Sequence, residues 1–539
     1  MVSAKVLERE IQRRRTFAII SHPDAGKTTM TERLLFMAGA IQAAGSVKSR
    51  KADKFAASDW MAMERERGIS VTTSVMRLDF EEYAVNLLDT PGHNDFSEDT
   101  YRTLTAVDSA LMLIDCAKGV ERQTIKLMGV CRMQKTPIVT FMNKLDRNGL
   151  DPLDLLENVE EVLGMDCVPI TWPIGMGQDL QGLYHLLKKE LILFQAGEEP
   201  KVIPLPSLQG PELEEWVGPG LAERAREEIE LLEIAGVSFA VEDYLAGKTT
   251  PVFFGSAING FGVQPMLDHF LDTAPHPKER GTESRTIEAM EDKVTGFIFK
   301  IQANMDPNHR DRLAFFRVCS GRFHRGQKLF NSRLGRDVKI ANPVFFLARD
   351  RNIAEEAWPG DIVGLYDQGS LEIGDSFSEG EVIQFSGIPS FAPEIFRRVV
   401  LEDPLKAKNL KKGLEQLAQE GAVQLFRPIG TSDSIVGVVG QLQLEVLRER
   451  LVNEYRVRGR FEPVELATAR WYTAEDEKAL TAFEKKMKSR LAVDVKGRPV
   501  FMAESQWRLR HTTEEYKHIQ FFETSDGLRK AILNREESP

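Results

Sequence analysis

Cysteine is scarce in this chain. Four cysteines occur in 539 residues, at Cys116, Cys131, Cys167 and Cys319. Their spacing fits no metal-ligand pattern, and so small a number does not indicate a disulfide framework. We therefore expect four reduced, mostly buried thiols that carry no chemistry.

Long apolar runs are also missing. The best candidate, near Leu111, is broken by Asp108 and Asp115, and is too short and too charged to cross a bilayer. The first fifteen residues contain no apolar core of the kind found in signal peptides. These absences predict a cytoplasmic protein with no membrane partner.

The chain lacks a net positive charge, repeats and low-complexity tracts. Its formal net charge is −11, which argues mildly against nucleic acid as a partner. Because charges are screened over about 8 Å near physiological salt, local patches matter more than the total. A hydrophobic fraction of 42% in 539 residues is ample for several packed cores, and domains of about 150 residues each suggest three or four of them.

A phosphate-binding loop is indicated near the N-terminus. An apolar run at residues 16–20, typical of a buried parallel strand, leads into SHPDAGKTT and then a helical segment. Backbone N–H groups near Asp24 would bind phosphate oxygens, Lys27 would reach the β and γ oxygens, and Thr28 would bind Mg²⁺. Ser21 stands where the usual pattern has glycine, and a plain surface loop is the alternative. The phosphate-binding residues would be Ser21, His22, Pro23, Asp24, Ala25, Gly26, Lys27, Thr28 and Thr29.

A second motif, DTPGH, follows another predicted strand at residues 84–88. Ligands collect at the carboxyl ends of strands in open α/β sheets. Asp89 would hold Mg²⁺ through water, and Gly92 would bring its N–H close to the γ-phosphate and act as a hinge. The motif consists of Asp89, Thr90, Pro91, Gly92 and His93.

His93 comes directly after that hinge. A lone histidine is more often an ordinary surface or core residue, but its register after Asp89 and Gly92 favours a role in aligning the attacking water.

The third motif, NKLD, selects the base. It follows an apolar strand at residues 137–141, and the Asp146 carboxylate would accept N1–H and N2–H₂ of guanine, donors that adenine does not offer in this arrangement. Lys144 would lie along the ring. A Gly-Ser-Ala sequence after the strand at residues 251–254 would complete the wall of the base-binding pocket through its backbone N–H groups. The base-binding residues are Asn143, Lys144, Leu145, Asp146, Ser256 and Ala257.

These motifs resemble those of the translational GTPases, the group that contains elongation factors Tu and G. The marks are Asp24 within the phosphate loop, ERERGIS at residues 64–70, and histidine after DTPG. The resemblance implies catalytic roles for His93, Lys27 and Asp24, with GTP or GDP and Mg²⁺ as cofactors. It also implies that Ser70 replaces a metal-binding switch threonine, with Thr72 as the alternative.

By the same resemblance, Pro23 and Ile69 form an apolar gate that keeps His93 from water until activation.

The expected fold class is α/β: a P-loop GTPase domain followed by a β-barrel and a split β-α-β, ferredoxin-like domain. We place the GTPase domain at residues 1–280, with an insertion at about 173–250, and the barrel at 281–388. The last domain covers 389–539 and ends in a short α/β appendage. In the barrel, residues 322–336 contain five cationic side chains and no carboxylate, which could be a solvated face or an RNA contact.

The segments IQANMDPNHRDR at 301–312 and GQLQLEVLRERL at 440–451 extend the resemblance to the class II, GTP-hydrolysing peptide-chain release factors of bacteria. This resemblance covers about residues 15–524. Elongation factor G is similar over its first three domains, but we expect this chain to end before its further arm.

The family implies a monomeric, ribosome-stimulated GTPase whose partners are the ribosome, through rRNA and ribosomal proteins, and the class I decoding release factors. It would promote departure of the decoding factor after peptide release, and GTP hydrolysis would drive its own departure. The alternatives are another ribosomal GTPase, translocase-like or rescue, and a nucleotide-gated binding module without turnover.

Overall fold

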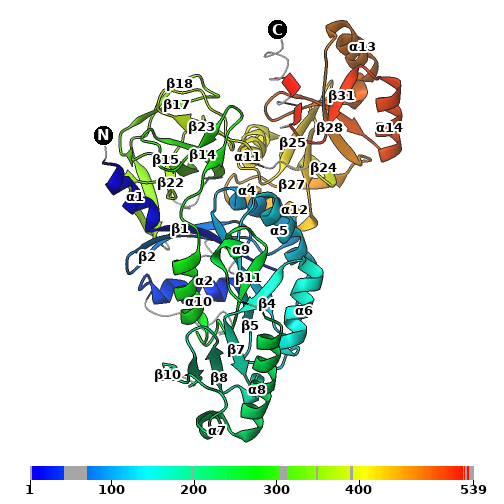
Figure 1. Cartoon of the computed structure of the whole chain (residues 1–539). Helices are drawn as coiled ribbons and strands as arrows, with labels where there is room; N and C mark the ends of the chain where they lie inside the picture. The colour runs from blue at the N-terminus through cyan, green and yellow to red at the C-terminus, as the bar shows by residue number, and fades with distance from the viewer. Residues whose placement is uncertain are drawn as a thin grey trace.

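An α/β domain, a β-barrel domain and a C-terminal α/β domain pack together in the computed structural model (Figure 1). The structure describes residues 3–41, 70–195, 199–236, 238–303, 312–347, 350–388, 392–525, 527–528 and 531–532. None of the described helices is long and apolar enough to cross a membrane.

The first domain is built on a seven-stranded sheet with the order β2-β3-β1-β4-β5-β11-β6. Only β2 runs antiparallel to its neighbour. The strands are β1 (Arg14–Ser21), β2 (Ser74–Phe80), β3 (Tyr83–Asp89), β4 (Ser109–Asp115), β5 (Ile138–Asn143), β6 (Asp166–Pro169) and β11 (Thr249–Phe254). Because the central strands are buried on both faces, their sequences are nearly continuous apolar runs.

Helices cover both faces of this sheet. Along β1, Phe17 and Ile19 pack with α2 and α10, whereas Ala18 and Ile20 face the cluster that contains α4, α5 and α6. The domain's helices are α1 (Ala4–Gln12), α2 (Lys27–Met37), α4 (Ser97–Thr105), α5 (Arg122–Met133), α6 (Pro152–Leu163), α9 (Val241–Leu245) and α10 (Val263–Thr273), with the 3-10 turn η1 (Asn94–Phe96). Helix α1 packs instead against Ala289 and Trp358. Successive side chains of a strand point to opposite faces, so this alternation along β1 is expected for a strand with helices on both sides.

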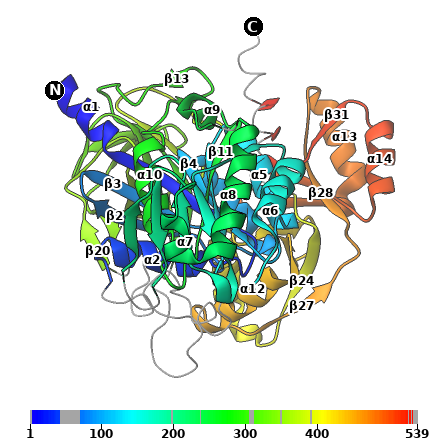
Figure 2. The same cartoon turned by 60° about the horizontal axis from the view of Figure 1, so that its bottom comes forward.

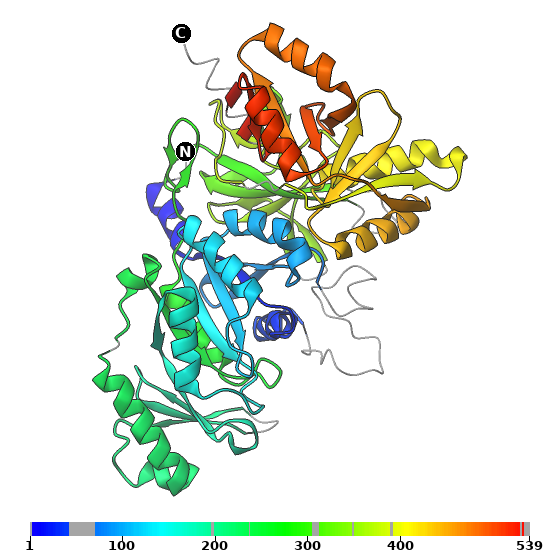
Figure 3. The same ribbon diagram turned by 90° about the vertical axis from the view of Figure 1, so that its right-hand side faces the viewer.

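An additional lobe lies between β6 and β11. It has a four-stranded antiparallel sheet with the order β10-β9-β8-β7, against which the lobe's helices pack. Its elements are β7 (Thr171–Ile174), η2 (Gly177–Asp179), β8 (Gly182–His185), β9 (Glu190–Leu193), β10 (Lys201–Pro204), α7 (Glu212–Val217) and α8 (Pro219–Ile234). Figures 1 and 3 show this lobe at the end of the molecule opposite to the C-terminal domain.

The second domain is an antiparallel sheet wrapped around its own apolar core. Its strand order is β18-β17-β23-β14-β15-β22-β19-β20, with β16 and β21 as a separate pair. The strands are β14 (Thr295–Ala303), β15 (Arg312–Ser320), β16 (Phe323–His324), β17 (Lys328–Asn331), β18 (Arg336–Lys339), β19 (Pro343–Leu347), β20 (Asp350–Ile353), β21 (Glu356–Ala357), β22 (Ile362–Tyr366) and β23 (Ser376–Ser378). The short ladder β12 (Arg280–Gly281) with β13 (Thr286–Ile287) precedes it.

The barrel and the first domain share one continuous apolar core. Ile298 and Phe316 point into the barrel, whereas Phe299 and Phe315, on the other faces of β14 and β15, belong to the same cluster as Leu104 of α4. All nine residues of β14 are buried, as are all nine of β15. The outer face of β14 and β15 is therefore an internal surface of the protein.

Buried charges cross this junction. Asp108 is 0% exposed and pairs with Arg317 at 2.5 Å and with Arg280 at 2.8 Å. A second pair joins Arg14 to Asp361 at 2.9 Å. Burial alone would raise the pKa of Asp108, but Arg317 and Arg280 outweigh it and hold that pKa below its ordinary value.

The C-terminal domain is an eight-stranded antiparallel sheet with the order β27-β24-β26-β25-β29-β30-β28-β31. Its strands are β24 (Ile395–Leu401), β25 (Gln424–Pro428), β26 (Ser434–Val438), β27 (Gly459–Pro463), β28 (Thr468–Ala474), β29 (Leu491–Asp494), β30 (Pro499–Ala503) and β31 (Ile519–Phe522). Its helices are η3 (Pro404–Lys406), α11 (Ala407–Gln419), α12 (Gln441–Asn453), α13 (Glu477–Met487), η4 (Lys488–Arg490) and α14 (Gln506–Glu515). Figure 2 shows α13 and α14 at the outer edge of the molecule.

The predicted fold class and the split β-α-β order of β24, α11, β25, β26, α12 and β27 are confirmed. The structure adds three details to this interpretation. The C-terminal appendage extends the same sheet, because β29 pairs with β25. Strand β28 and helix α14 were not predicted. The insertion contains two consecutive helices, α7 and α8, which are divided at Gly218, whose φ is 82°.

We predict that Asp108→Asn lowers the free energy of unfolding by about 3–5 kcal/mol, because it leaves Arg317 buried without its charge partner. Guanidinium unfolding at pH 7 measures this change. The exposed Asp292→Asn, which lies outside the helices, is the control and should change stability by less than about 0.5 kcal/mol.

Acid should remove the same contribution in the unmutated protein. Because the folded pKa of Asp108 lies below its ordinary value of 3.8, the stabilisation is complete above that pH and is lost as the pH falls through the lower, folded pKa. Equal stability of Asp108→Asn and the parent protein at pH 7 would contradict this account of the junction.

Candidate nucleotide-binding site

The predicted phosphate loop lies between β1 and α2. Asp24 and Gly26 adopt left-handed backbone conformations, with φ of 66° and 98°. Lys27, Thr28 and Thr29 form the first turn of α2, so their N–H groups lie at a helix N-terminus, where phosphate binds well. Only glycine fits at position 26, because a Cβ there would lie 2.2 Å from the Asn143 Nδ2.

Two of the predicted phosphate-loop residues have local contacts of their own. Ser21 is the last residue of β1, is 1% exposed, and donates from Oγ to the carbonyl of His22. The His22 Nε2 lies 3.2 Å from the carboxylate of Glu121. His22 is therefore turned toward α5.

The phosphate loop and the DTPGH motif are joined by a buried ion pair. Lys27 Nζ lies 2.5 Å from Asp89 Oδ1, and the two side chains are 6% and 1% exposed. Thr90 donates from Oγ1 to the carbonyl of Ile19 at 2.7 Å, which ties the motif to the end of β1. The carboxyl ends of β1 and β3 thus bring these residues together, as the parallel register requires.

The oxygen atoms around this pair suit a small hard cation. Asp89 Oδ2 is buried and has no hydrogen-bond partner among the described residues. The hydroxyls of Thr28 and Ser70 approach to 3.5 Å. Carboxylate and hydroxyl oxygens are ligands that Mg²⁺ accepts while keeping several waters. The described residues contain no group of three or more His, Cys, Asp or Glu that could hold a metal without a nucleotide.

The NKLD motif contacts the phosphate loop through Asn143. Its Nδ2 donates to the carbonyl of Ala25 at 2.7 Å, and its Oδ1 accepts from the N–H of Ala257 at 2.9 Å. Asn143 therefore joins the phosphate loop, the base motif and the loop after β11. In this arrangement the Ala257 N–H is bonded to Asn143, whereas we had expected it to face the base.

Asp146 and Lys144 are each held by a neighbour. Ser256 donates from Oγ to Asp146 Oδ1 at 2.6 Å, which fixes the carboxylate expected to read the base. Lys144 has a left-handed backbone, with φ of 73°, and its Nζ lies 2.6 Å from Asp115 Oδ2. Leu145, between them, is fully buried. Asp115 was not predicted as a site residue. Its position at the carboxyl end of β4, where the other site residues gather, could have identified it.

His93 stands at the exposed end of the DTPGH motif. Its side chain is 40% exposed, and its Nδ1 accepts from the N–H of Asp95 at 3.2 Å. Pro91 and Gly92 precede it, and a Cβ on Gly92 would lie 3.5 Å from the Cα of Pro23. Pro23 is therefore adjacent to this segment, whereas its predicted partner Ile69 lies outside the described residues.

A further carboxylate, Asp99, links the metal side of the site to the barrel. Its Oδ2 accepts from the N–H and the hydroxyl of Thr73 and from Lys300 of β14, at 2.7 to 2.8 Å. Burial would raise the pKa of Asp99, but Lys300 and Thr73 lower it below its ordinary value. Sequence reasoning missed this residue because its partners are distant in the chain.

Comparison with protein families assigns each domain. Residues 12–276 match the family model of the elongation factor Tu GTP binding domain, and residues 293–380 match elongation factor G domain 2. Residues 385–513 match the C-terminal domain of class II release factor RF3. The chain belongs to the translational GTPases of the class II release factor type. It therefore binds GTP and GDP and has GTPase activity.

A solved structure supports the fold of this GTPase. The crystal structure of a protein from Thermus thermophilus is 26% identical, with a TM-score of 0.69. The similarity covers 86% of this chain and 69% of that protein.

We predict that Asp146→Asn shifts the base preference from guanine toward xanthine, because an amide donor suits the O2 of xanthine. The loss in GTP affinity should be tenfold or more, since a charge-assisted pair is worth about 1.5–3 kcal/mol per bond. Titration with fluorescent GTP and XTP analogues measures both affinities, and Asp154→Asn is the control. Unchanged GTP preference would show that Asp146 does not read the base.

Proposed function

We propose that this GTPase acts in the cytoplasm, as a monomer, at the end of translation. In its GTP form it binds the ribosome after the finished peptide is freed and promotes dissociation of the class I release factor. Contact with the ribosome stimulates GTP hydrolysis, and hydrolysis then drives departure of the GTPase itself. The observation that carries the proposal is the presence in one chain of a translation-factor GTPase domain and the class II release factor C-terminal domain.

The site residues support this cycle chemically. Lys27 would bind the β- and γ-phosphate oxygens, exchanging part of its pairing with Asp89 for the nucleotide, while Asp24 shapes the loop. Mg²⁺, when bound near Thr28, Ser70 and Asp89, would neutralise the charge that develops between these phosphates. His93 would align the attacking water rather than remove its proton, because phosphoryl transfer depends mainly on positioning and electrostatics.

A cluster of unpaired cations on the C-terminal domain supports RNA as part of the ribosomal partner. We call it the basic ridge; its members are Lys406, Lys408, Lys411, Lys412, Arg456, Arg458 and Arg460. Lys406 Nζ donates to the carbonyl of Arg456 at 2.8 Å, so the start of α11 and the segment before β27 lie side by side. Among the described residues, none of the seven has an ion-pair partner, although Glu402 and Asp403 lie close in the chain.

The cationic stretch at residues 322–336 is a weaker candidate. Arg322 pairs with Glu356, Arg325 with Glu355 at 2.9 Å, and Arg333 with Asp375 at 2.5 Å. Three of its five cations are thus largely neutralised within the barrel. We therefore place the main RNA contact on the basic ridge.

Recycling is tested by the rate at which a fluorescent class I release factor leaves purified post-termination ribosomes. We expect acceleration with GTP and with a non-hydrolysable analogue, but not with GDP. His93→Ala should keep nucleotide affinity and one round of release, while ribosome-stimulated turnover falls by about 100-fold or more. With GTP, the His93→Ala variant should release the decoding factor as the parent protein does with the non-hydrolysable analogue.

Two results would redirect the assignment. If release of the decoding factor is unchanged while ribosomes still stimulate hydrolysis, the protein acts at another step, as a translocase-like or rescue GTPase would. If ribosomes do not stimulate GTP hydrolysis by the parent protein, the nucleotide-gated binding module without turnover becomes the better account. Unchanged stimulated turnover in His93→Ala would show instead that His93 does not align the attacking water.

The basic ridge makes a separate prediction. Reversing Lys411, Lys412 and Arg458 to Glu should weaken ribosome binding and reduce the slope of log affinity against log salt by about one per lost phosphate contact. GTP affinity without ribosomes should be unchanged. The control reverses three exposed cations elsewhere on the C-terminal domain, Lys478, Lys485 and Lys488. Equal losses in both variants would mean that total charge, not the ridge, governs binding.

A further inference from the structure

One residue of the first domain contacts both His93 and the C-terminal domain. Asp95 donates from its backbone N–H to His93 Nδ1 at 3.2 Å, and its Oδ1 lies 3.3 Å from the same nitrogen. Its other carboxylate oxygen, Oδ2, accepts from the N–H of Leu442 at 2.7 Å. The two contacting residues of the first and last domains are 347 positions apart in the sequence.

The second contact is a helix cap supplied from another domain. Leu442 is the second residue of α12, a 13-residue helix whose N-cap residue is Gly440. Glycine has no side chain with which to accept a bond from the first turn, and an oxygen acceptor at that position stabilises a helix. The Asp95 carboxylate takes this place and lies at the positive end of the helix dipole.

Gly440 is matched to this cap. A Cβ at position 440 would lie 1.9 Å from Asp95 Cγ and 2.1 to 2.2 Å from its two carboxylate oxygens. The backbone of Gly440 is extended, with φ of −140°, so the chain conformation itself does not require glycine. The absence of a side chain is therefore needed for the approach of Asp95.

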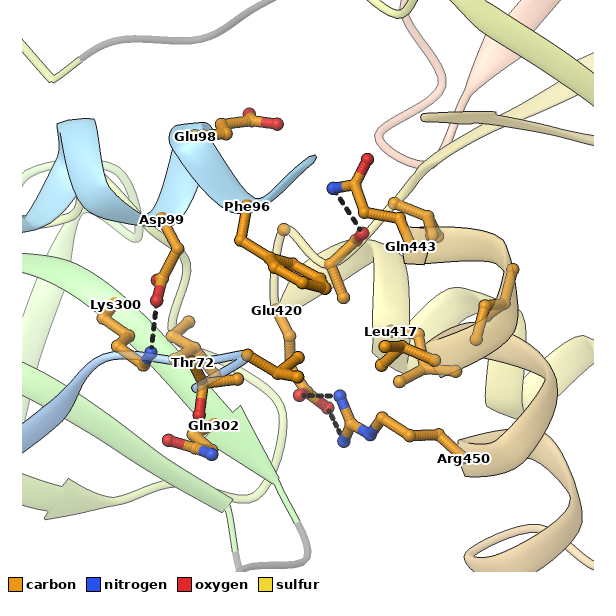
Figure 4. A pocket seen from close by; sticks show the side chains of 17 residues that line it. Thr72, Phe96, Glu98, Asp99, Lys300, Gln302, Leu417, Glu420, Gln443 and Arg450 are labelled. Atoms are coloured by element: carbon orange, nitrogen blue, oxygen red, sulfur yellow. Dashed lines mark hydrogen bonds and ion pairs between the residues drawn. The ribbon is translucent and has the colours of Figure 1, made fainter. Parts of the chain in front are cut away.

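Apolar side chains pack beside the contact between Asp95 and Leu442. Val71, Phe96 and Val446 form a buried cluster with Leu442 packed against it. Figure 4 shows Phe96 pointing from the start of α4 toward the helices of the C-terminal domain. Arg450 and Glu420 pair nearby at 2.9 Å, so the surrounding helices have their own fixed contacts. The Phe96 side of the cap is thus largely apolar.

We propose that Asp95 is a positioning residue through which the C-terminal domain sets the orientation of the His93 ring. A displacement of α12 would pull on the Asp95 carboxylate and so move the N–H that holds His93 Nδ1. While Nδ1 accepts that bond, the neutral ring carries its proton on Nε2 and offers a donor on its other side. The role of His93 in turnover rests on the proposed function; the mechanical link does not.

The experiment disturbs the link from both ends. Gly440→Ala places a methyl group against the Asp95 carboxylate, Asp95→Ala removes the carboxylate, and the double variant removes the clash as well. Gly220→Ala is the matched control, because a Cβ there would meet nothing within 4 Å. Asp95→Asn keeps an oxygen that can accept the Leu442 N–H.

The first readout needs no ribosome. In ¹⁵N-histidine-labelled protein, with His93→Gln used to identify the signal, we expect the His93 ring resonances to shift in Gly440→Ala and in Asp95→Ala but not in Gly220→Ala. Asp95→Asn should stay near the parent spectrum. An unmoved His93 signal in Gly440→Ala would overturn the proposal.

The second readout is ribosome-stimulated hydrolysis. We expect Gly440→Ala and Asp95→Ala each to lower kcat by about 10-fold or more, because small misplacements of catalytic groups are costly, whereas the KM for GTP and the affinity for GDP should not change. Gly220→Ala should turn over GTP as the parent protein does. The double variant should lose no more than Asp95→Ala alone. Losses that multiply in the double variant would contradict a shared pathway.

The two failures are distinguishable. If the parent protein does not accelerate departure of the decoding release factor, the proposed function fails, whereas the ring spectra still decide the link between α12 and His93. If the parent protein recycles release factors and Gly440→Ala has a parent-like spectrum and turnover, only the present inference fails.

Discussion

The contact that the rest of the structure depends on is the junction between the first domain and the barrel. Its apolar core runs without interruption from α4 into β14 and β15, and buried charges such as Asp108 with Arg317 specify the register of the two surfaces. Sliding one surface over the other would expose large apolar area and leave buried charges unpaired, and each is costly. We infer that these two domains move as one unit.

The C-terminal domain is attached differently. Its contacts with the nucleotide domain include the Asp95 cap, a small cluster around Phe96, and side chains around a pocket. It touches the barrel through polar side chains such as Arg312, which donates to Gln419 at 2.6 Å. We infer that this domain is the part whose position responds to the nucleotide. A full population shift needs about 5.5 kcal/mol of differential affinity, whereas a charge-assisted hydrogen bond supplies about 1.5–3 kcal/mol. The Asp95 cap can thus transmit the state, and ribosome contacts must contribute to the shift.

The sequence predicted the parts of the protein whose chemistry is local. A buried strand, a tight glycine turn and a helix N-terminus follow one another directly in the chain, so the phosphate loop could be recognised without its neighbours. The residues that hold the site together could not be recognised in this way. Asp115, Asp95 and Asp99 act on residues from other elements, and Arg322, Arg325 and Arg333 are neutralised by acids that local reading does not connect to them. Strand β28 was missed for a related reason: it pairs with β30 and β31, which come after an intervening helix.

The measurement that tests this account most directly is the set of distances between the three domains in each nucleotide state. Probes can be attached to cysteines placed at exposed Asp154, Lys328 and Glu477, because the four native thiols are buried and burial raises the pKa of Cys131 and Cys319 to about 12. The account predicts that the distance from Asp154 to Lys328 is the same with GDP and with a non-hydrolysable GTP analogue on the ribosome, while the distance from either to Glu477 changes. A changing Asp154 to Lys328 distance with a constant position of Glu477 would contradict it.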